Sequence, residues 1–167
     1  MGKPEYPLEQ ITLIKQKKLE EAERVLQERK NLLEKEKTKL FDLEKDRDKV
    51  KEHRDEKLKQ LREKLDEGTS TDKIQQMRLY MKEVDEKLRL KESKVKEQKK
   101  IVDAAEKKVE EARQEMIKRQ QDTEKMRLHK KEWEKEVKAA EEHLESLEMD
   151  ETGSAMFSRR RAKKPLT

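Results

Sequence analysis

Apolar residues recur at alternating steps of three and four through the second half of the chain. From Ile74 to Leu147 these steps visit 22 positions, of which 17 are apolar. No Gly or Pro lies between Asp72 and Thr152, and most of the remaining residues are strong helix formers. Because a disordered chain would not keep this register, the pattern predicts one long coiled-coil helix over about residues 72–149.

The first half carries a weaker stripe at the same spacing, which predicts a helix over about residues 8–66. Charged residues such as Arg47 and Arg54 interrupt this stripe, so we expect modest stability. Gly68 is a natural helix stop, and the Thr-Ser-Thr sequence after it can cap a new helix. The chain is therefore expected to turn at about residues 67–71.

Antiparallel pairing requires facing residues to have a constant sum of residue numbers, and the two stripes satisfy a sum of 138. This sum places the reversal at residue 69, inside the expected turn, and makes Leu61 face Met77. We therefore predict an all-α fold, a long two-helix antiparallel coiled-coil hairpin with unequal arms. A continuous helix in a parallel dimer is the alternative.

The second predicted helix is longer than the first, so the end of its apolar stripe has no partner within the hairpin. The unpaired positions are Val137, Ala140, Leu144 and Leu147. An uncovered apolar stripe usually marks a contact with another molecule. Two other outcomes remain open: residues 1–7 fold across part of the stripe with Tyr6 over Trp133, or the helix end frays.

The composition argues against an enzyme. Of the 167 residues 51% are charged and only 30% are hydrophobic, whereas a globular domain has about 45–50% apolar residues. Cys is absent, the three glycines are dispersed and none of the three histidines has a His or Cys three or four residues away, so we predict no catalytic residue, no cofactor and no metal site. With neither a signal peptide nor a membrane-spanning run, we expect a cytoplasmic protein that is not membrane-embedded.

The net charge of +5 comes from the last ten residues, which contain five basic side chains and no acid. These are Arg159, Arg160, Arg161, Lys163 and Lys164. We expect a single hairpin domain over residues 1–157, followed by a flexible basic tail over residues 158–167. Such a tail can neutralise the phosphates of nucleic acid or of anionic lipid, or it can dock on a partner. Since no aromatic residues accompany the charges, we do not expect nucleic-acid binding.

Four segments carry a family resemblance. They are residues 8–15 (LEQITLIK), 68–71 (GTST), 84–88 (VDEKL) and 150–157 (DETGSAMF), together with Ala22, Leu26, Tyr80, Arg159 and Arg160. In their order and in the arm lengths between them, they resemble the YscO/FliJ family of type III secretion and flagellar export proteins, and the YscO branch in particular. The resemblance spans nearly the whole chain.

The resemblance implies a non-enzymatic central stalk at the cytoplasmic base of the secretion apparatus, similar in shape to the gamma subunit of rotary ATPases. It implies that the end with both termini binds the hexameric export ATPase, through residues corresponding to Ile11, Ile14, Lys15, Lys18, Trp133, Val137 and Leu144. The turn end, near Leu79 and Tyr80, would approach an export-gate protein. Secretion chaperones are further implied partners, and the free protein is expected to be a monomeric hairpin.

Two other functions remain open from the sequence. A homodimeric coiled-coil scaffold or spacer would satisfy the apolar seam between chains. A binder of nucleic acid or anionic membrane would act through Arg159 to Lys164.

Overall fold

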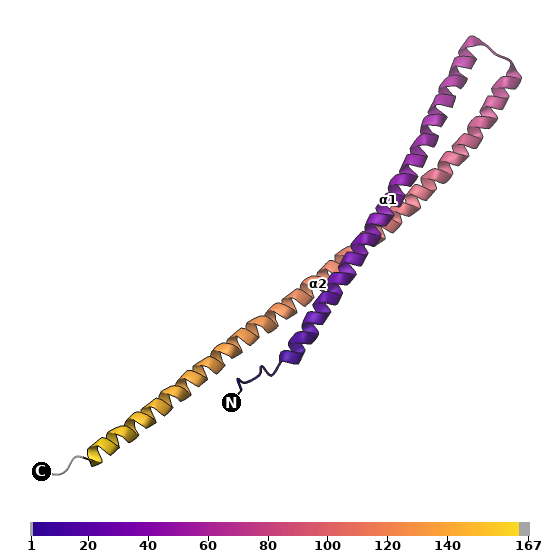
Figure 1. The fold of residues 1–167 in the computed structure, drawn as a ribbon. Helices are drawn as coiled ribbons and strands as arrows, with labels where there is room; N and C mark the ends of the chain where they lie inside the picture. The colour runs from indigo at the N-terminus through magenta and orange to yellow at the C-terminus, as the bar shows by residue number, and fades with distance from the viewer. Residues whose placement is uncertain (1, 164–167) are drawn as a thin grey trace. The chain divides into compact units, whose positions relative to one another are not determined.

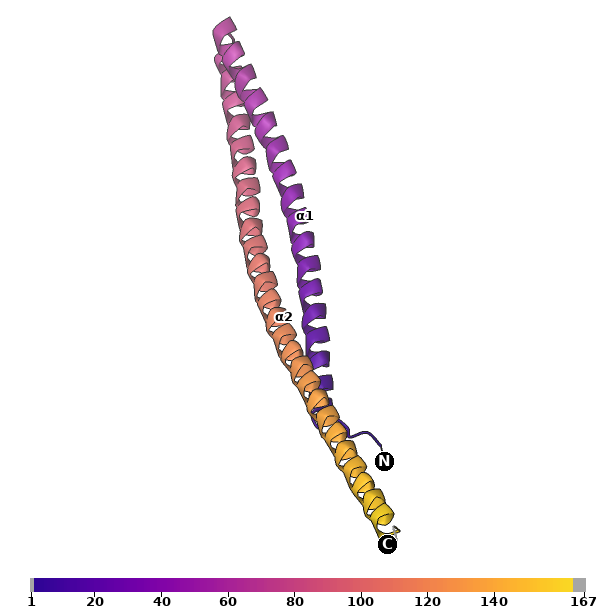
Figure 2. The ribbon, with the colours of Figure 1, turned by 90° about the vertical axis from the view of Figure 1, so that its left-hand side faces the viewer.

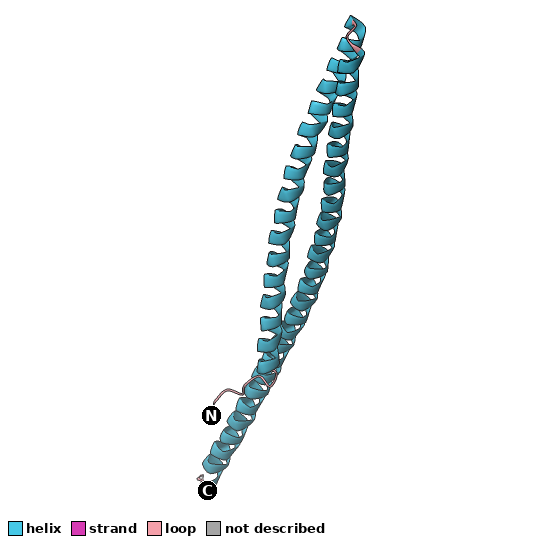
Figure 3. Ribbon diagram, turned by 90° about the vertical axis from the view of Figure 1, so that its right-hand side faces the viewer, coloured by secondary structure: helices cyan, strands magenta, loops and turns pink. Residues whose placement is uncertain are grey.

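A computed structural model describes residues 2–163 as two helices and little else. Helix α1 runs over Glu9–Glu67 and α2 over Thr71–Ala162. The two helices are antiparallel, and the turn joins them at one end (Figure 1). Non-helical backbone is confined to that turn and to the described chain ends (Figure 3). The predicted all-α antiparallel hairpin with unequal arms is therefore confirmed, with helices of 59 and 92 residues.

The turn needs only three residues, 68–70. Gly68 has a φ of 78°, a left-handed conformation that costs glycine little and that commonly ends a helix. The Ser70 carbonyl accepts a hydrogen bond from the backbone N–H of Ile74 at 3.2 Å, so Ser70 is the N-cap residue of α2. Both boundaries at the turn lie within one residue of their predicted places.

The chain divides into two compact units. The hairpin unit comprises residues 22–116, and the terminal unit comprises residues 1–21 and 117–167, of which 2–21 and 117–163 are described. In the hairpin unit α1 and α2 lie side by side (Figure 2), and Leu26, Val109 and Ala112 form a buried cluster. The buried residues of α2 in this unit all occupy predicted seam positions.

Polar residues also occupy the seam of the hairpin unit, where they pair across it. Gln98 is only 8% exposed, and its Nε2 donates hydrogen bonds to the Glu36 carbonyl oxygen at 3.1 Å and to Glu36 Oε2 at 2.6 Å. The bond from Gln98, helped by Lys39, lowers the pKa of Glu36. Likewise, Arg54 Nε donates to Asp85 Oδ1. Two of the polar positions that interrupt the α1 stripe, Glu36 and Arg54, therefore find partners on α2, whereas Arg47 pairs with Asp48 on α1 itself.

Helix α2 ends at Ala162 and not near residue 149, so the prediction of its end was wrong. Gly153 follows the predicted end of the helix, but one glycine inside an exposed helix costs only about 1 kcal/mol. The Thr152 hydroxyl donates back to the Glu148 carbonyl at 2.7 Å, which is compatible with continued helix. The last turn carries Arg159, Arg160 and Arg161, whose positive charges are favourable at a helix C-terminus.

Candidate partner-binding surfaces

In the terminal unit the first turns of α1 are tied to α2 by two ion pairs. Lys15 Nζ lies 3.6 Å from Asp122 Oδ2, and Lys130 Nζ donates a hydrogen bond to Glu9 Oε2 at 2.8 Å. The bond to Glu9 raises the pKa of Lys130. Lys15, which the family resemblance placed on the ATPase-binding surface, is therefore half-buried and engaged within the chain.

The arm of residues 2–8 that precedes α1 docks on α2 through Tyr6. Tyr6 is 6% exposed, its ring lies 5.3 Å from the Trp133 ring between centroids, and its hydroxyl is 2.6 Å from His129 Nδ1. Its carbonyl accepts a hydrogen bond from the Glu9 N–H at 3.1 Å, so the arm leads directly into α1. Tyr6 over Trp133 is the outcome that the sequence left open, and it leaves Trp133 half-buried.

Past this contact, the apolar stripe of α2 is uncovered. We call Val137, Ala140, Leu144 and Leu147 the terminal stripe. Val137 is half-buried, and every described residue after it is exposed, with Leu144 at 59% and Leu147 at 46%. The arm therefore covers the beginning of the unpaired segment and leaves most of the terminal stripe open to solvent.

On α1 the other predicted residues of this end lie on one exposed face. Ile11, Ile14 and Lys18 are spaced three and four residues apart, which places them together on a helix. All three are exposed. They neighbour the positions of Thr12, Lys15 and Leu19, which are half-buried.

A second exposed apolar group near the end of α2 was not singled out from the sequence. Met149, Met156 and Phe157, here called the distal group, are 60% exposed or more. Met149 follows Leu147 by two residues, a rotation of about 200° around the helix. Met149 and Met156 therefore lie on the side of α2 away from the terminal stripe, and Phe157 lies about 80° around the helix from Leu147. The position of the distal group outside the seam register is the reason that periodicity did not reveal it.

At the turn end, Leu79 and Tyr80 differ in their environment. Leu79 is 61% exposed. Tyr80 reaches α1, where its hydroxyl is 2.8 Å from His53 Nε2 and the two rings meet edge to face at 6.0 Å. Both tyrosines of the chain thus pair with a histidine, Tyr6 with His129 on α2 and Tyr80 with His53 on α1, and neither pair follows from sequence spacing.

The basic side chains of the C-terminal segment divide between the described and undescribed residues. Arg159, Arg160 and Arg161 are helical and exposed, and Lys163 is exposed just after α2. Lys164 lies outside the described residues. Over residues 2–163 neither helix contains a stretch apolar enough to cross a membrane.

Comparisons with known proteins agree with this geometry. The family model described as YscO-like protein matches residues 3–163. The chain is 43% identical to a solved structure from Chlamydia trachomatis described as a YscO homologue; the match covers 96% of this chain and 99% of that one, with a TM-score of 0.89. No curated protein matches the sequence. The chain belongs to the YscO-like family, which is associated with type III secretion.

Proposed function

We propose that this protein is a non-enzymatic stalk or adaptor that binds the hexameric export ATPase of a type III secretion system and couples it to the export gate. The observation that carries the proposal is the terminal stripe, an apolar strip that continues the seam beyond the end of its intramolecular cover. Exposed apolar strips of this kind fit a partner whose own apolar residues complete the packing. The protein would act at the cytoplasmic base of the secretion apparatus.

In this proposal the ATPase contacts the terminal stripe through Val137 and Leu144, with Ile11, Ile14 and Lys18 on the exposed face of α1. Trp133 would support that surface from beneath Tyr6, and Lys15 would position α1 through its ion pair with Asp122. The turn end, near Leu79 and Tyr80, would approach the gate protein. The role of secretion chaperones as partners rests on the family resemblance and is assigned to no residue.

The test is to place a charge on the terminal stripe. Leu144→Asp should weaken binding to the purified ATPase about tenfold or more, because a buried carboxylate at the interface loses its hydration. Ala140→Asp should act in the same direction. Binding is measured by calorimetry, together with stimulation of ATP hydrolysis.

The neighbouring alanine provides a matched control. Ala139→Asp adds the same charge and the same loss of helix propensity, but it lies about 100° away around α2 from Ala140. It should leave binding and stimulation near wild type. If Leu144→Asp and Ala140→Asp bind the ATPase as tightly as Ala139→Asp, the terminal stripe is not the contact.

The homodimeric scaffold makes a different prediction for the same stripe. If two copies cover each other's terminal stripe, light scattering will give twice the monomer mass, and Leu144→Asp will return it to the monomer value. A binder of nucleic acid or anionic membrane would instead lose a steeply salt-dependent affinity when residues 158–167 are deleted. A protein that is monomeric and that binds neither nucleic acid nor anionic membrane supports the proposed adaptor function.

A further inference from the structure

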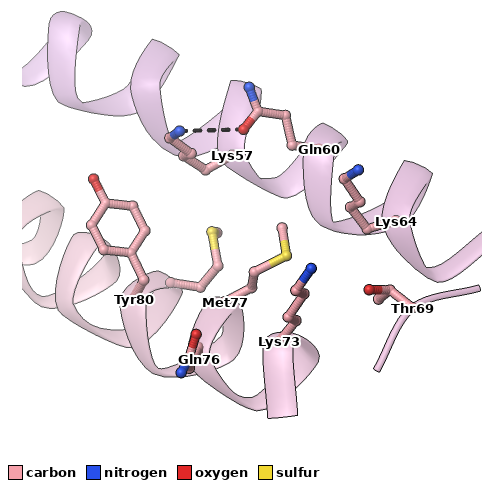
Figure 4. Close-up of a pocket in the computed structure, with 9 residues that line it drawn as sticks. Lys57, Gln60, Lys64, Thr69, Lys73, Gln76, Met77 and Tyr80 are labelled. Carbon is pink, nitrogen blue, oxygen red and sulfur yellow. Dashed lines mark hydrogen bonds between the residues drawn. The ribbon is translucent and has the colours of Figure 1, made fainter. Parts of the chain in front are cut away.

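A cavity of about 440 Å³ opens between α1 and α2 beside the turn. Figure 4 shows the residues that line it: Lys57 and Lys64 come from α1, and Lys73, Met77 and Tyr80 come from α2. The cavity lies entirely within the hairpin unit. Its size falls within the range of about 300–1,000 Å³ that is usual for sites that bind small molecules or single side chains.

The rim of this cavity is positive and poorly compensated. None of the residues that line it is acidic. Lys57 donates to the neutral Gln60 at 3.2 Å, and Lys64 lies 3.8 Å from Glu67 with both side chains exposed, a pairing worth little in water. Lys73 has no ion-pair partner among the described residues. The rim therefore favours an anionic ligand.

The floor of the cavity is apolar and adaptable. Met81 is 9% exposed and Met77 is half-buried, and Figure 4 shows Met77 between the two helices. Unbranched thioether side chains rearrange easily around an incoming group. Tyr80 lines one side and is held in place by its hydrogen bond to His53. Such a floor fits an apolar side chain better than a phosphate or a sugar.

We infer that this cavity binds an acidic peptide segment carrying one apolar anchor side chain. The anchor packs on Met77 and Met81, while flanking carboxylates pair with Lys57, Lys64 and Lys73. The inference deepens the turn-end part of the proposed function, because it states the chemistry of the partner that this end recognises. An anionic membrane is the less favourable ligand, since headgroups would meet the lysines but leave the apolar floor unfilled.

The experiment selects peptides from a random phage library on the full-length protein. Enriched sequences should combine Asp or Glu with a Leu, Met or aromatic residue. The best peptide, measured by fluorescence anisotropy, should bind the double variant Lys64→Glu/Lys73→Glu about fivefold more weakly or worse, as expected for two rim charges reversed. Its affinity should also fall as salt is raised.

The control reverses two lysines elsewhere on the hairpin unit. Lys100 and Lys107 are exposed and line no part of the cavity, so Lys100→Glu/Lys107→Glu should bind the peptide as wild type does. Enriched peptides without acidic bias, or an equal loss in both double variants, would overturn the inference. So would binding to phosphatidylserine vesicles that needs Lys64 and Lys73 while no acidic peptide binds.

This outcome is separable from that of the proposed function. Lys64→Glu/Lys73→Glu leaves the terminal stripe intact and should retain ATPase binding. Conversely, Leu144→Asp should retain peptide binding at the turn end. Loss of one activity without the other shows which of the two assignments has failed.

Discussion

Replacing Tyr6 by Ala should release the arm before α1 from α2. Tyr6 is the one residue of the arm that is buried, since residues 2–5 are exposed. Its ring packs on Trp133 and its hydroxyl bonds to His129. The substitution removes both contacts. Helices α1 and α2 should still form, because their contacts with each other do not depend on the phenol.

The size of the effect follows from these contacts. Burying an aromatic side chain contributes about 1.5–3 kcal/mol, a ring pair about 0.5–1.5 kcal/mol more, and the hydrogen bond about 1 kcal/mol. Ordering the backbone costs about 1–2 kcal/mol for each residue fixed. The contacts that Tyr6→Ala removes therefore contribute about 3–5 kcal/mol before this ordering cost, which is enough to shift the arm from docked to undocked.

Trp133 reports this change directly, because it is the chain's single Trp. In Tyr6→Ala its emission should move to longer wavelength and acrylamide should quench it more strongly, since its covering ring is gone. Tyr6→Phe keeps the ring and should behave nearly as wild type. Tyr80→Ala, which removes the other partner of a histidine, should leave the Trp133 signal unchanged. If Tyr6→Ala shows wild-type emission and quenching, the arm does not cover Trp133 in solution.

Four further substitutions test the two helices and the turn between them. Leu26→Ala removes a side chain from the buried cluster and should lower the free energy of unfolding in urea by about 2 kcal/mol, near the low end for core positions because the seam is narrow. Gly68→Ala should lower the free energy of unfolding by about 1 kcal/mol because Gly68 has a positive φ. Gly153→Ala should instead stabilise α2 and slow amide exchange around residue 153. A change in stability of the same sign at both sites would contradict the assigned conformations. Because the bond from Gln98 lowers the pKa of Glu36, the bond stabilises the fold fully at pH values above the ordinary glutamate pKa of 4.5. This stabilisation is lost as the pH falls through the lowered pKa. The stability difference between wild type and Gln98→Leu should therefore narrow on acidification, and a constant difference in thermal melts would refute that account.

The hairpin register was predictable because it depends on features that are local in sequence. Apolar spacing fixes which face of each helix is buried, and Gly68 fixes where the chain reverses. The buried residues Leu61, Val84 and Val95 all lie on the predicted stripes. The interruptions at Arg47 and Arg54 are half-buried in the same register, so even the polar positions followed the pattern.

The contacts of the chain ends were less predictable. Tyr6 and His129 are separated by 123 positions, and no spacing rule connects an irregular arm to a helix that far away. The continuation of α2 past Gly153 depends on small propensity differences, for which composition is a weak guide. Exposure of Leu144 followed from the unequal arms, whereas the ion pair of Lys15 with Asp122 depends on side-chain conformation and could not be deduced.

The polar pairs within the seam explain how a chain with so few apolar residues keeps one register. A slip of seven residues along α2 would again align apolar positions, because the pattern repeats with that period. It would also separate Arg54 from Asp85 and Gln98 from Glu36. The Gln98 amide is buried, so leaving it without its partner is costly. Apolar burial therefore drives the two helices together, while the polar pairs and the short turn determine which residues face each other. The four residues of the terminal stripe are all apolar, so in the proposed function no polar pair on the stripe would fix the register of the bound partner.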